Sequence, residues 1–118
     1  MRKILTVIPG CFLILLLFYS CSKGGDGGGG GVDCGTVSNK AFNADVFPIT
    51  QGRCNLAGCH ATGSTNGPGQ LTNYNEIFAA RAQIRSAVSA GRMPQGSTLS
   101  QSQKNSIICW IDGGAPNN

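Results

Sequence analysis

Two cysteines and a histidine lie together on one short stretch of the chain, at Cys54, Cys59 and His60. His60 is the only histidine in the sequence. Two thiols beside an imidazole can close a disulfide loop, bind a metal ion or attach a haem, so we expect chemistry here. Ala57 and Gly58, between the two cysteines, offer small side chains and a permissive backbone for a bulged turn.

A cysteine pair followed directly by a histidine is typical of covalent haem c attachment, which usually leaves two residues between the thiols. Each thiol adds to a haem vinyl group, and the histidine becomes an axial ligand of the iron. We therefore predict that Cys54 and Cys59 hold one covalent haem c and that His60 ligates its iron, across a gap of four residues. A Cys54–Cys59 disulfide and a zinc site are the alternatives, although structural zinc usually takes four protein ligands.

The N-terminal segment has the layout of an export signal. A basic start is followed by a mostly apolar run over residues 4–19 and then by Ser20 and Cys21. This junction is similar to the lipobox of bacterial lipoproteins. We expect a signal peptide over residues 1–20 and a lipid on Cys21, which would anchor the exported chain to a bacterial membrane. A signal peptide cut elsewhere and a signal anchor are the alternatives.

The next stretch, residues 21–31, consists largely of glycine, which predicts a flexible tether. The folded domain is expected over residues 32–118. The formal charge of the whole chain is +4, and it falls to +2 without the two basic residues of the signal peptide. A nucleic-acid partner would need a clustered basic face, which the sequence does not offer.

The pattern of apolar residues predicts an all-α domain with long loops, because no stretch alternates convincingly as a strand would. A short helix is expected within residues 42–51, with Pro48 in its first turn. Turn-forming residues over 61–70 predict a loop. The aromatic residues after the signal peptide make a thin core for a domain of this size, which a buried haem would fill; they are Phe42, Phe47, Tyr74, Phe78 and Trp110.

Two further helices are indicated downstream. The first is expected from about residue 74 to residue 88, capped by Thr72 or Asn73, with a break near Ala80 and a stop at Gly91. The last helix has a capping-box pattern at its start, Ser100 with Gln103, and a pair of glycines at its end, Gly113 and Gly114.

Met93 is the only methionine downstream of the expected signal peptide, and it lies in a Gly-Arg-Met-Pro sequence between two predicted helices. A thioether is a soft, neutral ligand that raises the reduction potential of haem iron. Pro94 stiffens the backbone beside it. We predict that Met93 is the second axial ligand, with a role as core filler as the alternative.

Cys34 and Cys109 remain after the other cysteines are assigned, since Cys11 lies in the export signal. In an oxidising compartment such a pair is expected to form a disulfide. We predict a Cys34–Cys109 bridge that attaches the first segment of the domain to its last helix. The alternative is a buried free thiol at Cys109 on the apolar face of that helix.

Taken in order, these features resemble small class I-like c-type cytochrome domains, above all those carried by bacterial lipoproteins. The likeness covers roughly residues 42–115 and is specific at residues 54–60, at Met93-Pro94 and at the last helix. That helix ends in Trp-Ile-Asp-Gly-Gly-Ala over residues 110–115, close to the Trp-Ile-Asp-x-Gly-Ala of the family. The resemblance implies a class I cytochrome c fold, with N- and C-terminal helices crossing beside the haem, and an electron-carrying role.

The function expected from these features is that of a lipid-anchored monohaem cytochrome. It would pass single electrons between redox partner proteins in the periplasm or at the cell surface, and it would not be an enzyme. If Met93 does not bind the iron, a haem sensor or a peroxidase is the alternative. A haem-free surface interaction module, stabilised by a disulfide or zinc, is the other.

Overall fold

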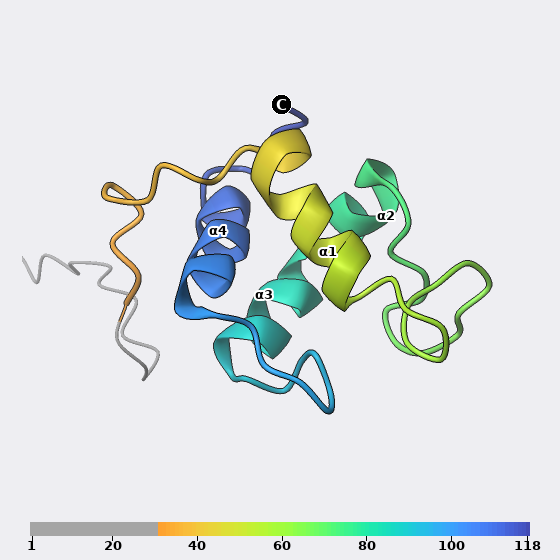
Figure 1. Ribbon diagram of the computed structural model, residues 1–118. Helices are drawn as coiled ribbons and strands as arrows, with labels where there is room; N and C mark the ends of the chain where they lie inside the picture. The colour runs from red at the N-terminus through yellow and green to blue at the C-terminus, as the bar shows by residue number, and fades with distance from the viewer. Residues whose placement is uncertain (1–30) are drawn as a thin grey trace, which may run out of the picture.

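The computed structural model describes residues 31–118 (Figure 1). The expected signal peptide, Cys21 and nearly all of the expected tether lie outside these residues. The described part is helical, with loops and without strands, which confirms the all-α prediction. Its elements in chain order are η1 (Phe42–Val46), α1 (Phe47–Arg53), α2 (Tyr74–Ala79), α3 (Arg81–Ser89) and α4 (Gln101–Asp112). Over this same span, none of the helices has the length and apolar character needed to cross a membrane.

The first helix is continuous from η1, a turn of π-helix, into α1. Pro48 lies in the first turn of α1, but η1 precedes it, so the proline is within the continuous helix and not in its first turn as expected. The helix begins at Phe42, the first residue of the expected segment. Asn118 at the far end of the chain explains this start. Its side-chain oxygen accepts from the Phe42 N–H at 2.8 Å, and its backbone carbonyl accepts from the Asn43 N–H at 2.7 Å. These bonds satisfy N–H groups that a helix start leaves without partners.

The second helical stretch breaks at Ala80, where the sequence predicts a break, so that α2 and α3 are separate helices. Asn73 caps α2 by accepting a hydrogen bond from the Glu76 N–H. After α3, Gly91 adopts a φ of 67°, which confirms it as the stop of the helix. The Arg92 N–H then donates back across Gly91 to the Ala87 carbonyl, as in a Schellman motif.

The last helix, α4, has the ends that the sequence predicts. Ser100 and Gln103 form a complete capping box, and the helix stops at Gly113 with Gly114 at a φ of 95°. Between these ends α4 buries Ile107 and Trp110 almost completely. In Figure 1 the first helix runs between α4 and α2, and α4 packs against both η1 and α3.

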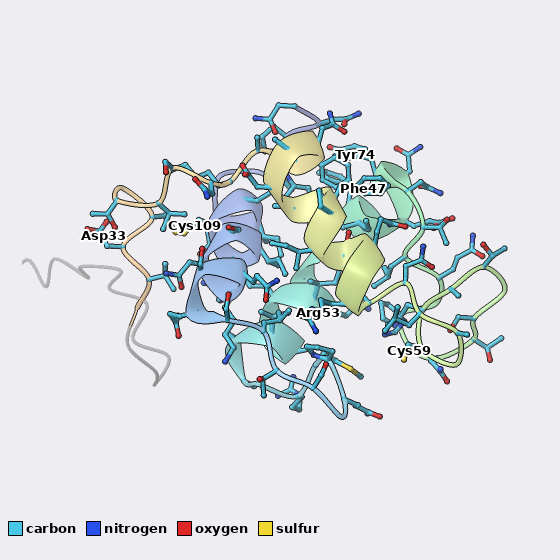
Figure 2. All side chains as sticks on the ribbon, in the orientation of Figure 1. Asp33, Phe47, Arg53, Cys59, Tyr74 and Cys109 are labelled. Atoms are coloured by element: carbon cyan, nitrogen blue, oxygen red, sulfur yellow. A yellow bond between two sulfur atoms is a disulfide. The ribbon has the colours of Figure 1, made fainter. Side chains whose placement is uncertain are left out.

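The aromatic residues of the described chain form one cluster where these helices meet. Phe42 lies at its centre, with its ring centroid 5.4 Å from Phe47, 5.0 Å from Tyr74 and 5.3 Å from Trp110. Phe78 stacks on Tyr74 at 5.5 Å. Figure 2 shows Tyr74 and Phe47 near the upper part of the first helix, away from its last residue, Arg53. The aromatic core therefore packs the helices together.

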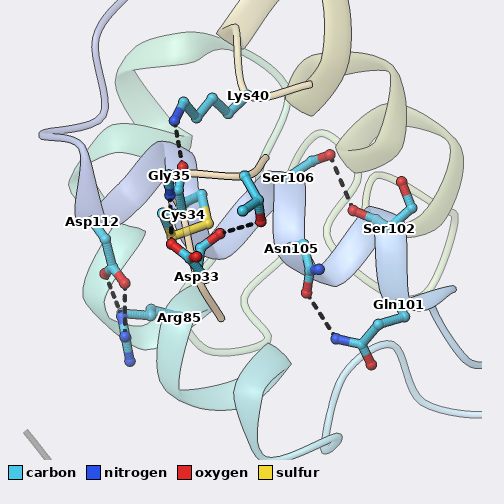
Figure 3. The surroundings of a disulfide bond; sticks show 12 residues. Asp33, Cys34, Gly35, Lys40, Arg85, Gln101, Ser102, Asn105, Ser106 and Asp112 are labelled. Atoms are coloured by element: carbon cyan, nitrogen blue, oxygen red, sulfur yellow. Dashed lines mark hydrogen bonds and ion pairs between the residues drawn. A yellow bond between two sulfur atoms is a disulfide. The ribbon is translucent and has the colours of Figure 1, made fainter. Parts of the chain in front are cut away.

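The predicted disulfide is confirmed. Cys34 and Cys109 are bonded, with their Cα atoms 5.3 Å apart, so the first described segment is attached to the C-terminal half of α4 (Figure 3). Within this segment, the Lys40 ammonium donates to the Cys34 carbonyl at 2.6 Å. The alternative of a free thiol at Cys109 is wrong.

Candidate functional site

A cavity of about 490 Å³ opens beyond the end of α1, between the loop that follows α1, helix α3 and the loop that follows α3. Its wall includes Cys54, Cys59, His60 and Met93. The fold thus brings these predicted site residues to one place, although Met93 is far from the others in the sequence. The volume falls within the range of about 300–1,000 Å³ found for small-molecule and cofactor sites.

The remainder of the cavity wall is largely apolar. Aliphatic side chains and prolines from the two loops and from α3 contribute Leu71, Ile84, Ala87, Val88, Pro68 and Pro94. The polar part of the wall comes from Asn66, Gln83 and Gln95. Arg53 is the one charged residue in the lining, and it lies at the last position of α1 (Figure 2). The cavity therefore suits a large apolar group that carries negative charge at one edge.

His60 is buried, with 6% of its surface exposed, and its ring Nδ1 lies 2.7 Å from the Gly69 carbonyl oxygen. A carbonyl only accepts, so Nδ1 must carry a proton and donate it. With the proton on Nδ1, Nε2 is the ring nitrogen left to bind a metal through its lone pair. A second bond, from the Leu71 N–H to the His60 carbonyl at 2.8 Å, holds the two segments together.

The turn from Cys54 to His60 accommodates its longer cysteine spacing by folding back on itself. The Leu56 N–H donates to the Cys54 carbonyl at 2.9 Å, and the His60 N–H reaches the same carbonyl at 3.1 Å. Gly58 adopts a φ of 78°, which a glycine reaches without strain. The added residues therefore bulge outward, and the Leu56 side chain is left 46% exposed.

Both thiols of this turn are free and half-buried. The alternative of a Cys54–Cys59 disulfide is therefore not what the structure contains. Burial, and secondarily the neighbouring Cys59, raise the pKa of the Cys54 thiol above its ordinary value. A raised pKa keeps the thiol protonated at neutral pH, unlike the thiolate of a redox-active or nucleophilic cysteine.

The loop that follows the turn folds over it through polar side chains. The Asn66 amide donates to the carbonyls of Gly58, at 2.9 Å, and Cys59, at 3.0 Å, and the Ser64 hydroxyl donates to the same Cys59 carbonyl. Sequence patterns do not indicate a site role for Ser64, Asn66 or Gly69, because the density of turn formers predicts only a loop. What they supply is backbone positioning, which leaves no distinctive residue pattern.

Across residues 31–118, no group of three or more His, Cys, Asp and Glu side chains is arranged to hold a metal ion. A structural zinc site takes four protein ligands, most often cysteines and histidines. Haem iron needs fewer protein ligands, because the porphyrin supplies the rest. The donor set of the cavity, an imidazole with a thioether and two free thiols, suits the second kind of group.

Comparison with known proteins adds no relative. No protein-family model matches the chain, and no curated protein or solved structure is significantly similar to it.

Proposed function

We propose that this protein is a monohaem c-type cytochrome that carries single electrons between redox partners. Cys54 and Cys59 would hold the macrocycle through thioether bonds, and His60 and Met93 would be the iron ligands. The observation that carries this function is the meeting of all four side chains in the wall of one cavity.

The chemistry of the cavity wall fits a haem. Apolar side chains such as Leu71, Ile84 and Val88 match the faces of the macrocycle. The single cation of the lining, Arg53, has the charge needed beside a propionate. The hydrogen bond from the His60 Nδ1–H to the Gly69 carbonyl makes Nε2 the nitrogen that would bind the iron. For a metal-ligating histidine, a hydrogen bond of this kind orients the imidazole and raises its basicity as a ligand.

Each group of the site would serve electron transfer, and none would make or break a bond in a substrate. A bound haem supplies a one-electron couple between ferric and ferrous iron. The protein would bind and orient the group, exclude water with its apolar wall, and supply His60 and Met93 as iron ligands. A Met ligand favours the ferrous state relative to a second histidine, and hence a higher potential. If both residues bind the iron, no position would stay open for a substrate, and we expect no enzymatic activity.

The expected lipid on Cys21 and the glycine-rich tether would locate this function at a membrane surface. A domain held at a bacterial membrane by a flexible segment can meet successive partner proteins within the reach of that segment. We therefore propose that it exchanges electrons with redox proteins in the periplasm or at the cell surface.

A pyridine haemochrome spectrum with an intact mass tests the cofactor. The protein is made in a host that matures c-type cytochromes, and we expect one covalent haem per chain. Cys59→Ser should retain at most one thioether bond and shift the haemochrome band, because one vinyl group stays unsaturated. A wild-type mass equal to that of the bare polypeptide would contradict the proposed function.

A further inference from the structure

The Gly69 carbonyl that holds the His60 proton belongs to a short segment without regular structure, residues 69–72. Such a segment has no helix or strand ladder to fix the direction of its carbonyls. Its position must therefore come from other contacts. One of these is the bond from the Leu71 N–H to the His60 carbonyl. The Gly69 N–H also donates to the Asn66 carbonyl, and the Gln51 amide reaches the Leu71 carbonyl at 3.4 Å. The remaining contacts, those of Gln70 and Thr72, converge on a single carboxylate, that of Glu76 in the first turn of α2.

Both oxygens of the Glu76 carboxylate bind this segment. Oε2 accepts from the Thr72 backbone N–H at 2.7 Å and from the Thr72 hydroxyl at 2.8 Å. Oε1 accepts from the Gln70 side-chain amide at 2.5 Å. The Gln70 side-chain oxygen in turn accepts from the Gly63 N–H at 2.9 Å, in the loop that follows His60. The carboxylate thus connects α2 to the segments on both sides of the histidine.

These bonds exceed what the start of a helix requires. In a capping box the third helical residue bonds the N–H of the N-cap itself, which here is Asn73. Glu76 instead bonds Thr72 and Gln70, which lie further upstream, while Asn73 caps the helix with its own side chain. The hydrogen bonds also lower the pKa of Glu76 to about 2, so the carboxylate remains an acceptor throughout the neutral range.

We propose that Glu76 is a positioning residue for His60. Through Thr72 and Gln70 it fixes the segment whose Gly69 carbonyl holds the Nδ1 proton, and so sets the orientation and basicity of the imidazole. The consequence at the iron rests on the proposed function. A hydrogen-bonded imidazole is a stronger donor and stabilises ferric iron, so weakening the bond should raise the reduction potential.

Glu76→Gln tests this role with little change of shape. A carboxamide offers one acceptor oxygen where the carboxylate offers two, and its NH₂ group would face a donor from Gln70 or Thr72. We expect the His60 Nδ1 proton to exchange with solvent about tenfold faster, as for the loss of one hydrogen bond, when followed by ¹⁵N NMR. In the holoprotein, the midpoint potential of the ferric/ferrous couple should rise.

Asn73→Ala is the matched control, because it removes the cap of the same helix and leaves the Glu76 carboxylate in place. It should lower stability without changing the potential or the exchange of the Nδ1 proton. Gln70→Ala, outside the helix, should reproduce the effect of Glu76→Gln in the same direction. The double variant should then change the exchange rate by less than the sum of the two single effects.

The proposal is overturned if Glu76→Gln and Gln70→Ala both leave the exchange rate at the wild-type value. It is equally overturned if Asn73→Ala accelerates exchange as much as Glu76→Gln, since the helix start rather than the carboxylate would then hold the segment. Exchange of the Nδ1 proton can be followed with or without haem. A wild type without haem would thus refute the proposed cytochrome function while the positioning role is still decided by exchange.

Discussion

At the scale of single residues, the site depends on the His60 imidazole, which carries a proton on Nδ1 and donates it in a hydrogen bond. The Gly69 carbonyl accepts from Nδ1 at 2.7 Å, and Gly69 itself has a φ of 102°. Residues with a side chain rarely adopt this backbone conformation. The glycine therefore lets the carbonyl turn toward His60, and this requirement is local to one residue.

Replacement of Met93 distinguishes an iron ligand from a core filler. Met93→Ala should lower the reduction potential and let the ferrous iron bind carbon monoxide, because the thioether that favours ferrous iron is gone. Met93→Leu is the matched control for packing, since it retains similar volume without a sulfur ligand. We expect both variants to show the same spectral change in a redox titration. A Leu variant with the wild-type spectrum and potential would assign Met93 to packing alone.

The low pKa of Glu76 predicts a pH dependence of stability. Since folding lowers this pKa from 4.5 to about 2, the carboxylate stabilises the folded state above pH 4.5, and this contribution is lost as the pH falls toward 2. Urea unfolding between pH 4.5 and pH 2 should show that the free energy of unfolding falls less steeply with decreasing pH for Glu76→Gln than for the wild type. Asn73→Ala retains the carboxylate and removes only the smallest of the interactions that lower its pKa, so its slope should lie close to that of the wild type. Parallel profiles for Glu76→Gln and the wild type would contradict the assignment.

At the scale of elements, the last helix is the best specified in the sequence and the most deeply buried in the structure. Its capping box and its glycine stop are both local patterns. Its inner face packs Ile107 and Trp110 against η1 and α3. The indole N–H of Trp110 donates to the Pro116 carbonyl at 2.8 Å, so the segment after the helix folds back over its own core residue.

Loss of the α4 cap should have a measurable cost. Ser100→Ala removes the side-chain oxygen that accepts from the Gln103 N–H, and we expect a loss of about 1 kcal/mol in the free energy of unfolding. Ser102→Ala, an exposed position in the first turn of the same helix, is the control. It should leave stability unchanged or slightly raised, because alanine is the better helix former. Equal unfolding midpoints for the two variants would count against the cap.

At the scale of the whole molecule, two long-range connections close the described chain. The Cys34–Cys109 disulfide attaches the first described segment to α4, and Asn118 bonds the start of the first helix. Both join parts of the chain that are distant in sequence. The helices consequently meet around one aromatic cluster, while the cavity lies beyond the end of α1.

Removal of the disulfide should destabilise the domain. A bridge between residues 75 apart constrains the unfolded chain, and typical values predict a loss of about 2–4 kcal/mol. Cys34→Ser tests this by urea unfolding, since it leaves the buried Cys109 side chain in place. The wild type treated with a reductant provides the comparison. The bridge would be refuted if both thiols of this pair can be alkylated in the native wild type and if Cys34→Ser is as stable as the wild type.

Lipidation of Cys21 is a prediction at the same scale, although this residue lies outside the described part of the chain. Incorporation of a labelled fatty acid, and a processing step sensitive to globomycin, are expected in a bacterial host. Cys21→Ser should abolish both and release the protein from the membrane fraction. A wild-type protein in the soluble fraction, with no lipid in its mass, would contradict the anchor.

Much of this molecule follows from short stretches of sequence. The helix caps at Asn73 and Ser100, the stops at Gly91 and Gly113, and the Cys54–His60 turn depend on residues within a few positions of one another. Local hydrogen bonds and backbone preferences determine such features, so the chain needs no tertiary contact to indicate them. The predicted ligand types and the disulfide pair follow likewise from residue chemistry.

Tertiary structure decided the rest. Nothing near Gly69 in the sequence identifies its carbonyl as the acceptor for His60, because every residue carries such a carbonyl and the choice depends on how two loops pack. The start of the first helix at Phe42 depends on Asn118, and the Glu76–Gln70 bond depends on the path of the segment between them. Backbone acceptors and distant partners leave no pattern of residue types, and only the folded chain brings them within hydrogen-bonding distance.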